Sequence, residues 1–101
     1  MKEIKELFEK ITEEIEGAEE YAKEALRHKD MDHDRAEVYM EMSKQELKHV
    51  DNLHTMVVKL IKDYKARGGE IPKGMEDIYD WEHESMISWV AKVKMLQDMF
   101  R

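Results

Sequence analysis

Apolar residues return at steps of three and four along three long segments of the chain. In the first segment, residues 2–27, the steps alternate between four and three without interruption. This spacing places the apolar side chains on one face of an α-helix, with the heptad period of helices that pack together. The positions concerned are Ile4, Phe8, Ile11, Ile15, Ala18, Ala22 and Ala25.

The second segment, residues 34–66, repeats the same steps, and Gly68-Gly69 follows it as a helix stop. A polar linker precedes it, and three aspartates there can each cap the next helix. These are Asp30, Asp32 and Asp34. The predicted stripe consists of Tyr39, Ser43, Glu46, Val50, Leu53, Val57, Leu60 and Tyr64.

A third helix is predicted over residues 75–100, beyond Pro72. Its stripe is Tyr79, Glu82, Met86, Trp89, Val93, Leu96 and Phe100. No segment alternates with the period of a strand. The pattern therefore predicts an all-α fold in one domain, residues 1–101, in which three antiparallel helices form a bundle and the first two make a long hairpin. We expect the bundle to be completed by association into a homodimer or a larger homo-oligomer.

Composition agrees with long helices and excludes several classes of protein. Of the 101 residues, 41% are charged, with 4 Gly, 1 Pro and 0 Cys, which excludes disulfide scaffolds and low-complexity chains. No stretch is apolar enough to cross a membrane, and the charged start is not typical of a secretory signal. With a net charge of −7, we expect no nucleic-acid or membrane partner. The absence of cysteine fits a cytoplasmic location.

Two carboxylates interrupt the apolar stripes. Glu46 stands between Ser43 and Val50, and Glu82 stands between Tyr79 and Met86. A buried carboxylate costs several kcal/mol unless it is paired, protonated or bound to a metal. These two residues are therefore the first candidates for chemistry.

Further donors lie close to Glu46 in the helical register. His49 follows it by three residues and so projects from the same face. Glu14 borders the stripe of the first helix, and Tyr21 follows Glu14 two turns later. Carboxylate and imidazole together suit iron, manganese or zinc. His83, next to Glu82, is an alternative ligand.

A Glu-x-x-His pair is expected about once by chance in a chain with this many Glu and His residues. The motif alone is therefore not evidence of a metal site, and the evidence is the position of Glu46 on the apolar stripe. An ion pair at the core edge would also account for Glu46 and His49, and Glu14 could be a solvated flank. Three other pairs have the same spacing, namely Asp30/His33 in the linker, Asp51/His54 at the edge of the stripe or off it, and Asp80/His83. We interpret His54 as a surface or interface histidine.

These residues resemble the ferritin-like di-iron carboxylate family, including rubrerythrins and encapsulated ferritins. The Glu14–Tyr21 segment is similar to the family's Glu-x6-Tyr, and Glu46–His49 to its Glu-x-x-His, over about residues 4–66. The resemblance implies that Glu14 and His49 are terminal ligands, Glu46 a bridging ligand and Tyr21 a neighbour of the ligands. It also implies a di-iron cofactor and, if the protein is an enzyme, oxidation of ferrous iron.

The chain departs from the family in having three helices and one convincing Glu-x-x-His unit, where a complete member has four helices and two units. Two arrangements remain open. A homodimer could supply four Glu and two His to a shared site, or one chain could use Glu82 as a further ligand. The alternative class is a helical assembly or adaptor protein without a metal. A ferritin-like scaffold that has lost its metal is a third possibility.

Overall fold

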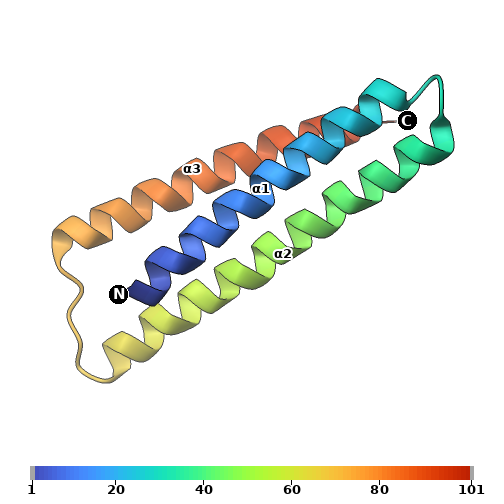
Figure 1. Ribbon diagram of the computed structural model, residues 1–101. Coiled ribbons are helices and arrows are strands. Elements are labelled where there is room, and N and C mark those ends of the chain that lie inside the picture. Colours follow the sequence, from blue (N-terminus) through green and yellow to red (C-terminus); the bar gives the residue numbers. More distant parts are fainter. Residues whose placement is uncertain (1, 101) are drawn as a thin grey trace.

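The chain folds into three helices with no strand among residues 2–100, which are the residues that the computed structural model describes. They are α1 (Lys2–His28), α2 (His33–Ala66) and α3 (Lys73–Asp98). Consecutive helices run in opposite directions, so α1 and α3 point the same way (Figure 1). The rod they form measures 57 × 18 × 17 Å. The all-α prediction is confirmed. None of these helices has a stretch long and apolar enough to span a bilayer.

Helix α1 carries the apolar stripe that the sequence predicts. All seven positions of that stripe, from Ile4 to Ala25, are buried. The stripe packs chiefly against α2, and α3 lies beside α1 with far less contact to α2. Burial of this face on two neighbours is what holds α1 in the middle of the molecule.

Helix α2 buries a different set of residues from the one predicted. Its buried residues are Ala36, Met40, Ser43, Leu47, Val50 and Val57. The predicted stripe shares only Ser43, Val50 and Val57 with this set, and Glu46 is only half-buried at the flank. The prediction that Glu46 lies in the middle of the core stripe is therefore wrong. The cause is α3, which covers a neighbouring strip of α2 and shifts its buried face.

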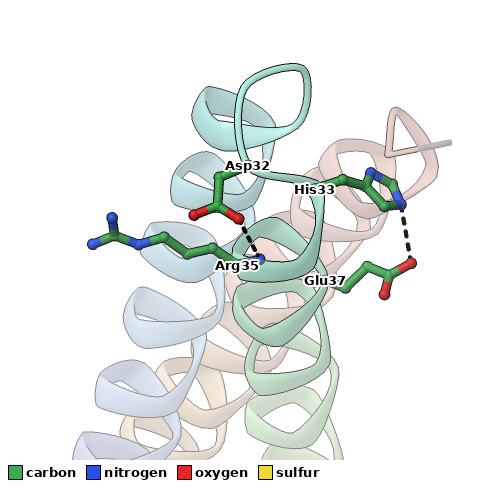
Figure 2. A network of polar contacts seen from close by, with 4 residues as sticks. All are labelled: Asp32, His33, Arg35 and Glu37. Carbon is green, nitrogen blue, oxygen red and sulfur yellow. Dashed lines mark hydrogen bonds and ion pairs between the residues drawn. The ribbon is translucent and has the colours of Figure 1, made fainter.

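The ends of α2 follow ordinary capping chemistry. Asp32 is the N-cap, and its side chain accepts a hydrogen bond of 3.2 Å from the backbone N–H of Arg35 (Figure 2). His33 is the first residue of the helix, and its Nε2 lies 3.0 Å from Oε1 of Glu37, one turn further on (Figure 2). At the other end Gly68 has φ +82°, the left-handed conformation that glycine adopts most easily after a helix. The predicted stop at Gly68-Gly69 is confirmed.

Helix α3 begins directly after Pro72 and ends at Asp98, two residues earlier at each end than predicted. It is held to the hairpin by a few specific contacts. The indole N–H of Trp89 donates to Glu19 Oε2 at 2.6 Å, and the rings of Phe8 and Tyr79 stack at 5.9 Å. Only Val93 is buried among its described residues, so α3 is the most exposed of the three helices.

Candidate metal centre

Three of the predicted ligands meet on one side of the hairpin. Glu14 of α1 and Glu46 and His49 of α2 each offer a donor atom, and these atoms lie within 4.8 Å of one another. His49 Nδ1 is 3.3 Å from Glu14 Oε2. Among the described residues, this is the one group of three or more acidic or histidine side chains with such spacing.

The packing of α1 on α2 brings these side chains together. Ser43 is completely buried, and its hydroxyl donates to the carbonyl oxygen of Ala18 at 2.7 Å. Ser43 lies about one turn before Glu46, and Ala18 about one turn after Glu14. Since the two helices are antiparallel, a bond between Ser43 and Ala18 sets Glu46 beside Glu14. The register of the hairpin therefore builds the cluster.

The cluster is open to solvent on one side. The Glu14 side chain is 28% exposed and the His49 side chain is 55% exposed, while Glu46 is half-buried. If His49 Nδ1 carries the proton toward Glu14, its Nε2 lone pair is left available as a donor. A metal held here would keep coordination positions facing the exterior.

Gly17 leaves room next to Glu46. A Cβ placed on Gly17 would lie 3.5 Å from Glu46 Oε2, an ordinary van der Waals distance. Ala would therefore fit in the single chain, although glycine inside a helix costs about 1 kcal/mol relative to Ala. Contacts within the chain do not explain why this position is glycine.

The cluster faces away from α3. Glu19, which binds Trp89 of α3, follows Glu14 by five residues, which is about 140° around the helix. The hairpin face that carries Glu14 is consequently not covered by α3.

Two other predicted site residues, Glu82 and His83, lie outside this cluster. Glu82 lines a shallow depression between α1 and α3, together with Lys5, Phe8 and Tyr79. His83 instead stacks on His54 of α2, with ring centroids 4.9 Å apart. The structure thus does not bring Glu82 or His83 to Glu14.

Tyr21 lies on the α1 side of the hairpin but pairs with another aromatic ring. It stacks on Tyr39 of α2 with ring centroids 6.2 Å apart and is half-buried. No hydrogen bond joins its hydroxyl to the cluster among the contacts of the described residues. Its predicted role beside the ligands therefore stays a prediction.

The sequence indicated a surface or interface position for His54 but placed it at the edge of the predicted stripe or off it. His54 falls on the buried face of α2, between Val50 and Val57, and not at its edge. The signal was present in the spacing of Met40, Leu47 and His54, which follows the same heptad steps as the predicted stripe. The sequence interpretation instead follows the alternative stripe, which contains Glu46 and the aromatic residues Tyr39 and Tyr64.

No protein-family model, no curated protein and no solved structure matches the chain. Membership of the ferritin-like family therefore stays a prediction from the sequence.

Proposed function

We propose that this protein binds a transition metal through Glu14, Glu46 and His49, with iron as the favoured ion. The observation that supports the proposal is the convergence of three donor atoms from two helices within 4.8 Å. Two carboxylates and one imidazole form a donor set that suits iron, manganese and zinc. Manganese and zinc are the alternatives that a binding experiment should include.

We further propose that two chains share the site. One chain supplies three donors, which are too few for a dinuclear centre, whereas two chains related by a two-fold axis would supply four Glu and two His. The face around Glu14 is free of α3, and the absence of a side chain at Gly17 would allow a second backbone to approach it closely. This is the arrangement that the resemblance to encapsulated ferritins implies.

An iron pair held in this way would supply ferrous oxidation by dioxygen or peroxide. The part of the chain's own residues is to fix the donors and leave the exposed side open to the oxidant. Glu14 Oε2 lies 3.3 Å from His49 Nδ1. A metal bound by both side chains would replace this contact. The half-burial of Glu46 would keep its carboxylate close to both helices.

The experiment is a measurement of metal content after aerobic loading with ferrous ion and desalting, together with the mass from light scattering. About two irons per dimer are expected. One metal in a particle of monomer mass would instead favour a site within one chain. Absence of retained iron, manganese and zinc would overturn the proposal.

Ligand variants test the residues themselves. Glu14→Gln, Glu46→Gln and His49→Gln should each remove most of the bound metal because each deletes one donor. Glu82→Gln is the matched control, since Glu82 is also a half-buried glutamate and lies outside the cluster. Equal metal content in all four variants would contradict the assignment.

A second candidate function is that of a helical assembly protein without a metal. One observation favours it. Helix α3 exposes large apolar side chains over more than half of their surface, namely Ile78, Trp81, Ile87 and Met95. Of these, Ile78 and Trp81 lie one turn apart on the same face of α3, and adjacent exposed apolar side chains can mark a protein interface. If this candidate holds, the mass in solution will not depend on metal or on Glu46.

A further inference from the structure

Two histidines form one of the contacts between α2 and α3, on the side away from the metal cluster. The bond from Gln97 to Ser43 is another. The imidazole rings of His54 and His83 stack with their centroids 4.9 Å apart and their planes 11° apart. Both residues are half-buried. Neither belongs to the ligand set proposed above, and their contact does not depend on a metal.

The surroundings of His54 disfavour its protonated form. Burial lowers the pKa of His54 below the ordinary value of 6.5, and the nearby His83 lowers it further. Asp51, one turn earlier on α2, opposes both effects by raising the pKa. The net direction is downward, so His54 is neutral near pH 7 in the folded chain.

Charged groups around the pair come from all three helices. On α2 the acting charge is Asp51. On α3, Asp80 lies one turn before His83, and both Asp80 and the adjacent Glu84 are exposed. On α1, the exposed Glu9 is a charged residue that borders α3. No charge of α1 acts noticeably on His54 within the described part of the chain.

The part of α1 packed at this level is apolar. The contacts Phe8–Tyr79 and Glu19–Trp89 bracket His83 along the parallel helices α1 and α3. The buried α1 residues between them include Ile11 and Ile15. A charge introduced on the histidine pair would therefore have an apolar neighbour on one side and a second imidazole on the other.

Helix α3 is the helix most easily detached. It touches α2 little and buries only Val93 completely among its described residues. We propose that the His54–His83 contact makes the docking of α3 sensitive to protons, so that mild acidification releases α3 from the hairpin. Release would expose the apolar faces that α3 and the hairpin now present to each other.

The direction follows from linkage between proton binding and docking. The docked state holds His54 with a lowered pKa, so the released state binds a proton more readily. Docking is therefore fully favoured above pH 6.5 and weakens as the pH falls from 6.5 toward the lower value of the docked state.

The test uses Trp89 as a reporter, since it lies on α3 and binds Glu19 of α1. Trp81 is replaced by Phe so that Trp89 is the single tryptophan, and its emission is followed from pH 8 to pH 5. We expect a reversible shift to longer wavelength below pH 6.5, accompanied by binding of a dye that reports exposed apolar surface. His54→Gln and His83→Gln should abolish this transition or move it to lower pH.

His28→Gln is the matched control, because the described contacts of His28 are with Tyr39 and Glu24 on the hairpin. It should leave the transition unchanged. A transition that persists unchanged in both His54→Gln and His83→Gln overturns the proposal. So does an emission spectrum that stays constant in the parent between pH 8 and pH 5.

A second measurement covers the case in which the glutamine variants fail to dock α3 at pH 8. Proton NMR of the histidine ring resonances in the unmodified chain should give a His54 midpoint below 6.5 that coincides with the Trp89 transition. An ordinary midpoint for His54, or one that does not coincide, contradicts the proposal. The Trp89–Glu19 bond is lost only below pH 4.5, outside the pH range of this titration, because the pKa of Glu19 is lowered from 4.5.

Discussion

Gly17 of α1 lies against the carboxylate of Glu46, one of the proposed metal ligands, so that a Cβ at position 17 would stand 3.5 Å from Glu46 Oε2. In the unloaded single chain, Gly17→Ala should raise the free energy of unfolding by about 0.5–1 kcal/mol, because Ala is the better helix former. Urea unfolding at low protein concentration measures this.

The same substitution should have the opposite effect on the loaded assembly, because a methyl group would hinder the approach of a second backbone. We expect less dimer by light scattering and less retained iron in Gly17→Ala than in the parent. Equal dimer and equal iron would show that close approach at Gly17 is not needed.

Ser43 joins all three helices, because it donates to Ala18 of α1 and accepts from Gln97 Nε2 of α3 at 2.9 Å. Ser43→Ala should lower the free energy of unfolding by about 1–2 kcal/mol, since both bonds are lost at a fully buried position. Ser88→Ala, at an exposed site of α3, is the control and should change it little. Urea unfolding measures both.

The bond between Trp89 and Glu19 predicts a pH dependence of stability. The Trp89 indole and then Lys23 lower the pKa of Glu19 from 4.5. The stabilisation is therefore complete above pH 4.5 and is lost as the pH falls through the lower value of the folded state. Trp89→Phe should cost about 1.5 kcal/mol at pH 7 and progressively less below pH 4.5.

Chemical unfolding at pH 7, 5 and 3.5 gives this difference directly. Glu19→Gln keeps an acceptor but removes the charge, so it should flatten the acid dependence without losing the whole bond. A cost of Trp89→Phe that is the same at all three pH values would contradict the charged bond.

Tyr79 has a buried hydroxyl oxygen without a hydrogen-bond partner. Burial also raises the pKa of this phenol above 10.0, which indicates an apolar environment. Tyr79→Phe should leave stability unchanged or raise it by about 1 kcal/mol, because an unsatisfied polar group is removed and the ring contact with Phe8 stays. A destabilisation of more than about 1 kcal/mol would indicate that the hydroxyl has a partner. Thermal unfolding is sufficient to decide.

Glu46→Leu separates the two candidate functions. In the metal-binding protein it should abolish iron retention while leaving the unloaded chain as stable as the parent or up to about 1 kcal/mol more stable, since a half-buried carboxylate is removed. In an assembly protein it should change neither mass nor partner binding. Loss of metal-dependent dimer in Glu46→Leu supports the metal site, and retention of both dimer and iron excludes it.

The sequence alone determined the number of helices, their ends to within two residues and the core face of α1. These features depend on local interactions. Asp32 caps its own helix, and Gly68 adopts the left-handed conformation after α2 ends at Ala66. Helix α1 has a single apolar face, whereas α2 has two. The helix ends and the core face of α1 can therefore be recognised without knowing how the helices pack against one another.

The tertiary structure decided which face of α2 is buried and which polar residues meet. Two heptad registers of α2 share Ser43, Val50 and Val57, and the sequence contains apolar residues on both. Only the position of α3 selects between them. Because α2 packs against both α1 and α3, the spacing of its own apolar residues does not determine which of the two faces is buried. The position of α3 brought His54 against His83. The register between α1 and α2, set by the bond between Ser43 and Ala18, placed Glu46 beside Glu14.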